Sequence, residues 1–141
     1  MTYHFRIHLD PDGLWAECVE LPGCRTEAES EEALRGACKE ALNLYLEEPS
    51  DSKLVFPLPE ERLDRDPALW EVAVEPEIAF AVLLRHYRSN ARMTQKQVAE
   101  LLGMKNVYSY QRLERKSNPS LNLLKRIKSI FPEMNLDSLL Q

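Results

Sequence analysis

The chain contains few glycines and no long apolar segment. Its four glycines form neither a P-loop nor a glycine-rich dinucleotide fingerprint, so the common nucleotide-binding folds are not indicated. No stretch approaches the ~20 consecutive apolar residues that a membrane-spanning helix needs. The first residues alternate between apolar and polar side chains, so we expect no signal peptide. We therefore expect a cytoplasmic protein with no membrane partner.

Cysteine is also scarce, and its spacing argues against a structural role. Cys18, Cys24 and Cys38 are odd in number and lack C-x-x-C spacing, which favours reduced, buried thiols over disulfides. His4 and His8 are the nearest additional candidates for zinc ligands. Their spacing from the cysteines fits no common structural zinc site, and both fall on the polar side of a predicted strand. We therefore expect neither a bound metal nor a cofactor.

Charge is distributed very unevenly along the chain, whose net charge is −5. Residues 1–75 contain 18 Asp and Glu but 7 Lys and Arg, a net charge of −11. Residues 76–141 contain 5 acidic and 11 basic residues, a net charge of +6. Such a division favours two binding partners of opposite charge.

The acidic part of the chain has the pattern of a small sheet with one helix. Apolar and polar residues alternate over Tyr3–Leu9, which predicts a half-buried strand, and Asp10–Gly13 is a typical turn. Further strands are predicted over Leu14–Val19 and Cys24–Ala28. Ser30 is a good N-cap for the helix that follows. The expected apolar face of this helix consists of Leu34, Ala37, Cys38, Ala41 and Tyr45.

The rest of this first domain is predicted to be a long loop and one more strand. Residues 49–67 contain four prolines and many charges, which favour an extended loop. Residues 70–74 alternate again and are predicted to form the last strand. The resulting order, β-β-β-α-β, is that of an α+β domain over residues 1–74.

Residues 75–141 are predicted to form an all-helical domain of about five helices. Pro76 suits the first turn of one helix, and Thr94 with Gln97 forms a capping-box pattern at the start of the next. Further helices are expected over about 106–115, after Ser120, and over 136–140. The sequence T-Q-K-Q-V-A-E-L-L-G of residues 94–103 is typical of a helix-turn-helix, with Ala99 as the small contact residue.

From about Glu77 to Leu140 the chain resembles the Cro/C1 (Xre-type) repressor domains. The resemblance implies that Gln95 lies near a phosphate and that Arg88 pairs with Glu114. It also implies that Lys105, Arg115 and Lys116 contact the DNA backbone. Lys96, at the start of the first helix of the helix-turn-helix, is expected to do the same. The side chains expected to face base edges are Asn106, Val107, Tyr108 and Arg112.

The two domains together resemble the HicB antitoxin family. The residues that carry this resemblance are Gly13–Cys18 (G-L-W-A-E-C), Leu21–Cys24 (L-P-G-C), Ala41–Leu46 (A-L-N-L-Y-L) and Tyr108–Glu114 (Y-S-Y-Q-R-L-E). The resemblance implies a partial RNase H-like first domain. It also implies a partner toxin of the HicA type, which is a small basic ribonuclease whose active site the antitoxin covers. The pair then represses its own operon.

The expected toxin-binding residues are Trp15, Glu27, Glu29 and Glu31. The alternative is that these glutamates, together with Glu32, mainly stabilise the N-terminus of the following helix and aid solubility. In either case a negatively charged domain is attracted to a cationic nuclease and competes with RNA for it.

We expect the first domain itself not to be an enzyme. RNase H chemistry needs several carboxylates on adjacent strands to hold two metal ions. The strand Tyr3–Leu9 has none, and Glu17 stands alone on the second strand. We therefore expect an antitoxin that binds palindromic double-stranded operator DNA as a dimer or larger oligomer. The alternative is a one-component transcriptional regulator whose first domain senses a small molecule, which would require a roomy apolar pocket.

Overall fold

A computed structural model describes all 141 residues and divides them into two compact units. The sheet unit comprises residues 1–46, 57–75 and 141, and the helical unit comprises residues 47–56 and 76–140. Residues 47–56, called the 47–56 segment below, therefore belong to the helical unit, although the predicted boundary assigned them to the first domain. None of the helices combines the length and apolar composition that crossing a bilayer requires.

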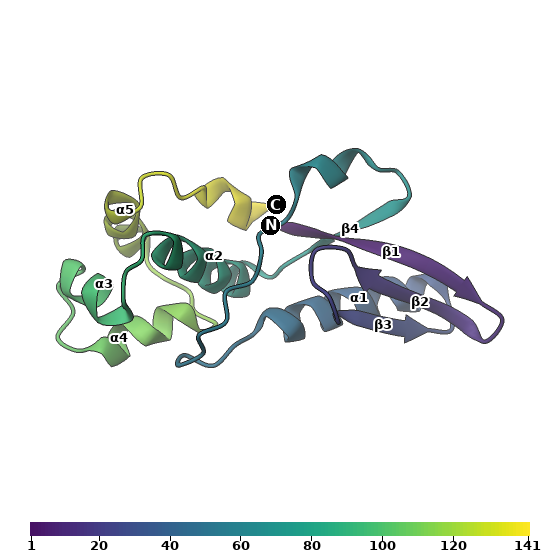
Figure 1. Ribbon diagram of the computed structural model, residues 1–141, viewed down its shortest axis with the longest axis horizontal. Helices are drawn as coiled ribbons and strands as arrows, with labels where there is room; N and C mark the ends of the chain where they lie inside the picture. The colour runs from purple at the N-terminus through teal and green to yellow at the C-terminus, as the bar shows by residue number, and fades with distance from the viewer. The chain divides into compact units, whose positions relative to one another are not determined.

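The sheet unit contains one antiparallel sheet and one long helix (Figure 1). The strands β1 (Thr2–Asp10), β2 (Gly13–Cys18), β3 (Arg25–Ala28) and β4 (Leu69–Ala73) are arranged in the order β3-β2-β1-β4. The helix α1 (Glu31–Leu46) follows β3 and packs against the sheet. The α+β class expected from the sequence is confirmed.

The main core of the sheet unit lies between α1 and one face of the sheet. Tyr3 and Phe5 of β1 are fully buried there, together with Ala16 of β2. The buried stripe of α1 differs from the predicted face. It follows an i, i+4 row consisting of Leu34, Cys38, Leu42 and Leu46, whereas Ala37, Ala41 and Tyr45 are only half-buried at its border. Leu42 and Leu46 therefore fill the part of the core that the prediction assigned to Ala37, Ala41 and Tyr45.

The opposite face of the sheet is covered in part by the segment that was predicted to be an extended loop. This segment contains a 3₁₀ helix, η1 (Glu61–Arg65), and its Asp64 side chain contacts His4 of β1. His4 is therefore fully buried, although the period-two pattern placed it on the polar side of its strand. The alternation identifies the face correctly, but it carries no information about a distant segment that covers that face.

The three cysteines are free and buried, as expected. Burial raises the pKa of Cys18 to about 12, with the nearby Glu20 charge adding to the effect. Burial likewise raises the pKa of Cys24 and that of Cys38 to about 11. The thiols are thus held in the protonated form, which is a weak nucleophile and a poor metal ligand.

The helical unit is built around α2 (Pro76–Asn90), in which Ile78–Arg85 are all buried. The helices α3 (Gln95–Leu101), α4 (Val107–Gln111) and α5 (Leu121–Ile130) follow. The predicted helix over 106–115 is shorter than expected, because α4 gives way to a 3₁₀ turn, η2 (Arg112–Glu114). A last 3₁₀ helix, η3 (Leu136–Leu140), ends the unit. The core around α3 and α4 consists of Val98, Ala99, Leu102, Tyr110 and Leu113.

Candidate functional site

The α3–turn–α4 element is defined by local sequence signals. The Thr94 hydroxyl accepts the Gln97 N–H at 3.1 Å, and the Gln97 side chain accepts the Thr94 N–H at 2.7 Å, which completes the capping box. Gly103 has a φ of 70°, a conformation that favours glycine, and it ends the first helix. Asn106 caps α4 through its side-chain oxygen, which accepts the Ser109 N–H at 3.0 Å.

Most side chains that were expected to contact DNA lie on the surface of this element. Tyr108 is 69% exposed, whereas Tyr110, which lies two residues later, is fully buried. Val107 is half-buried at the start of α4. The amide oxygen of Asn106 is engaged in the helix cap, so its NH₂ group is the part left to meet a base. The other exposed members of the set are Lys96, Lys105, Arg112, Arg115 and Lys116.

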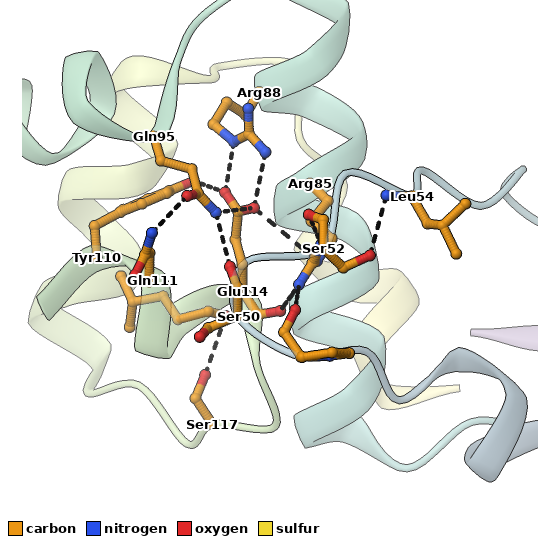
Figure 2. Close-up of polar contacts among 12 residues, drawn as sticks. Ser50, Ser52, Leu54, Arg85, Arg88, Gln95, Tyr110, Gln111, Glu114 and Ser117 are labelled. Atoms are coloured by element: carbon orange, nitrogen blue, oxygen red, sulfur yellow. Dashed lines mark hydrogen bonds and ion pairs between the residues drawn. The ribbon is translucent and has the colours of Figure 1, made fainter. Parts of the chain in front are cut away.

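Gln95 is the exception, because its side chain is bonded within the helical unit (Figure 2). Its NH₂ group donates to the Ser50 carbonyl at 3.1 Å and to the Glu114 carboxylate at 3.2 Å. Its side-chain oxygen accepts a hydrogen bond from Gln111 at 3.0 Å. A phosphate contact by this side chain would have to replace these bonds.

The Glu114 carboxylate is the centre of a buried polar network (Figure 2). Arg88 on α2 donates two parallel hydrogen bonds to it, from Nε at 2.6 Å and from Nη2 at 2.9 Å. The Tyr110 hydroxyl also donates to this carboxylate. The hydrogen bond with Glu114 raises the pKa of Arg88, so the arginine stays charged. The pair thus connects α2 to the end of the α4–η2 segment, in the arrangement that the repressor resemblance implied.

Arg85 is the buried arginine of α2, and the sequence pattern did not predict its role. It is only 3% exposed, and it donates to the backbone carbonyls of Glu114, Ser52 and Pro49 at 2.6 to 3.0 Å. Burial lowers its pKa, and the Glu114 charge opposes this effect. One sequence signal could have indicated its burial: Arg85 lies at the end of the apolar run of α2, one turn before Arg88. These bonds hold the 47–56 segment against α2.

On the sheet unit, three of the four expected toxin-binding residues lie together. Trp15 stacks on His8 with ring centroids 4.0 Å apart, and Glu27 is its direct partner on β3. An open pocket of about 400 Å³ lies beside them, and Glu29 also lines it. Glu31 lies elsewhere, in the first turn of α1, where it pairs with Arg35 at 3.4 Å. The full lining of this acidic pocket is Asp10, Asp12, Gly13, Leu14, Trp15, Glu27, Ala28 and Glu29.

No family model matches this chain, and no curated protein matches it. Its function must therefore be argued from the two surfaces: the exposed basic residues around α4 and the acidic pocket beside Trp15.

Proposed function

We propose that this chain is the antitoxin of a type II toxin–antitoxin pair. In this proposal the helical unit binds operator DNA as a dimer, and the sheet unit binds and inhibits a cationic, HicA-like ribonuclease. The single observation that carries the proposal is the exposure of basic and polar side chains around a capped helix-turn-helix whose inner face is fully packed. Neither unit is assigned a catalytic role.

The DNA-binding half rests on the rigidity and the charge of this element. Arg112 is exposed only two residues before Glu114, which is buried and fixed by two bonds from Arg88. The backbone that carries Arg112 is therefore held in place before any DNA arrives, which suits direct contact with base edges. Lys105 and Arg115 lie at either end of the α4–η2 segment and suit contacts with phosphates.

We expect the substitution Arg112→Ala to weaken binding to the chain's own operator by about 1–3 kcal/mol and to relax base preference. Lys105→Ala should weaken binding to all duplexes about equally, because a phosphate contact carries no sequence information. Fluorescence anisotropy with a duplex from the chain's own promoter and with a scrambled duplex measures both effects. Lys39→Ala, which removes the same charge from an exposed position on α1, is the matched control.

Two results would count against this DNA-binding surface. One is a full-length protein that binds the promoter duplex no better than the scrambled one. The other is an Arg112→Ala variant whose affinity and base preference match those of Lys39→Ala.

The toxin-binding half rests on the acidic pocket. Carboxylates that line an open pocket favour a guanidinium or ammonium group through ion pairs. The Trp15 ring already contacts His8 and the Arg25 guanidinium, which lies 4.8 Å from the ring centroid, so the carboxylates are the groups that would bind a further cation. The net charge of −11 on residues 1–75 adds long-range attraction to a basic partner. We infer that the pocket accepts a Lys or Arg side chain of the ribonuclease.

Co-expression of the full chain with the product of the neighbouring reading frame tests this half. We expect a stable complex in which RNA cleavage is blocked. The double substitution Glu27→Gln/Glu29→Gln should speed dissociation by ~10-fold or more and reduce the salt dependence of binding. The matched control is Glu40→Gln/Glu47→Gln, which removes two exposed charges outside the pocket. Failure of the two proteins to co-purify would remove the main support for an antitoxin.

A further inference from the structure

His4 lies in a buried polar cluster that neither proposed binding surface uses. Its Nδ1 atom is 2.7 Å from a Glu20 carboxylate oxygen, and its Nε2 atom is 2.7 Å from an Asp64 carboxylate oxygen. Glu20 is itself buried, and it accepts the backbone N–H groups of His4 at 2.9 Å and Glu60 at 3.2 Å. The imidazole is therefore held by a carboxylate that is fixed in turn by two backbone donors.

A third carboxylate lies on the neighbouring strand. Glu71 of β4 is the direct partner of His4 in the β1–β4 register, so the two side chains share one face of the sheet. Ligand atoms of His4, Asp64 and Glu71 all lie within 4.8 Å of one another. Three different elements, β1, η1 and β4, thus bring one imidazole nitrogen and two carboxylates to one point.

The charges in this cluster are unbalanced. Glu20, Asp64 and Glu71 surround a single imidazole. Burial opposes a charged His4, but its hydrogen bonds with Glu20 and Asp64 outweigh burial and raise its pKa, so the imidazole can pair with these two carboxylates. No charged partner remains for Glu71. The Glu71 side chain is exposed and makes no hydrogen bond. Carboxylates gathered near a buried group favour an added positive charge, which a divalent cation supplies.

We propose that His4, Asp64 and Glu71 bind a first-row divalent cation of the Zn²⁺ class. Histidine nitrogen and carboxylate oxygen both bind Zn²⁺, at about 2.0–2.2 Å, and three protein ligands leave the fourth position of a tetrahedral site open to water. Glu20 orients the His4 ring by accepting a hydrogen bond from Nδ1, as a carboxylate usually does for a metal-binding histidine. The nitrogen ligand favours Zn²⁺ over Mg²⁺ and Ca²⁺, which prefer oxygen alone.

The cysteines are not among the ligand atoms that meet at this site. The Cys18 thiol contacts only the supporting carboxylate, because it donates to Glu20 at 3.8 Å. The thiols of Cys18 and Cys38 are also held protonated by burial. The proposed site is therefore distinct from a cysteine-based zinc site, and it is independent of the toxin and DNA surfaces.

Isothermal titration of the full-length, chelator-treated protein with ZnCl₂ tests the site, and Co²⁺ absorption spectra report the ligands. We expect one binding event, and a higher midpoint of thermal unfolding in the presence of Zn²⁺. Glu71→Gln and Asp64→Asn should each lower the affinity by ~10-fold or more. Both positions are exposed, so both variants should fold. Glu61→Gln, which changes an exposed neighbour of Asp64 on η1, should bind like the unmodified chain.

Two outcomes would overturn the proposal. If Zn²⁺ changes neither the heat signal nor the unfolding midpoint, the cluster is only an internal hydrogen-bond network around His4. If Zn²⁺ binds but Glu71→Gln and Asp64→Asn keep full affinity, the ion lies elsewhere on the chain. Both measurements use the protein without DNA or toxin, so they do not depend on the proposed function.

Discussion

Replacing Glu114 with glutamine is expected to destabilise the helical unit by about 3–5 kcal/mol. The carboxylate is 1% exposed, and it neutralises Arg88 through two hydrogen bonds. An amide of the same size leaves the half-buried Arg88 without its counter-charge. Removing one partner of a largely buried ion pair costs more stability than replacing both partners. Glutamine has only one accepting oxygen, so its NH₂ group must face donors. These are Tyr110 and Arg88 Nε in one orientation, or Gln95 and Arg88 Nη2 in the other. Urea unfolding followed by far-UV circular dichroism measures the loss.

The matched control for this prediction is Glu100→Gln, which makes the same chemical change at an exposed position on α3 and should cost little. Both tryptophans lie within residues 1–75, so their fluorescence reports on the sheet unit and should change little in either variant. A double variant in which Arg88→Met accompanies Glu114→Leu should be more stable than Glu114→Gln alone. A loss below ~1 kcal/mol for Glu114→Gln would mean that the network contributes little to stability.

Replacing Arg85 with methionine is expected to release the 47–56 segment from the helical unit. The guanidinium is the donor for the carbonyl oxygens of Pro49, Ser52 and Glu114, and methionine supplies none. Each buried carbonyl left without a partner costs ~1–3 kcal/mol, and the segment avoids that cost by moving into water. We therefore expect a loss of about 2–4 kcal/mol in the stability of the unit.

Limited proteolysis provides a direct measurement of this release. Lys53 lies within the 47–56 segment, and tryptic cleavage after it should become ~10-fold faster or more in Arg85→Met. Mass spectrometry identifies the cleavage position. Lys125→Met, an exposed substitution on α5, is the control and should leave the rate unchanged. Equal cleavage rates in the two variants would show that other contacts hold the segment in place.

Elements set by local signals could be predicted from the sequence. The capping box of Thr94 and Gln97, the turn at Gly103 and the alternation in β1 each involve residues within a few positions of one another. The burial of Tyr110 and the exposure of Tyr108 follow from helical periodicity in the same way. These signals need no knowledge of the rest of the chain, whereas the basic residues around α4 were expected from the resemblance to the repressor domains.

The features that could not be predicted depend on contacts between distant residues. His4 is buried by Asp64, which lies 60 positions later. Gln95 is turned inward by Ser50, which lies 45 positions earlier. A hydrophobic pattern gives the face of a strand or helix, but it does not show which distant segment covers that face. The polar clusters around His4 and Arg85 were missed for this reason.

The bonds from Arg85 to Pro49 and Ser52 have a consequence for dissecting the protein. Since residues 47–56 lie between two parts of the sheet unit in the sequence, no single cut of the chain yields an intact helical unit. A fragment starting at Pro76 would keep Arg85 but retain only one of its three acceptor carbonyls, that of Glu114. Deletion mapping would thus compare damaged folds, so point substitutions in the full chain are the sounder way to assign each activity.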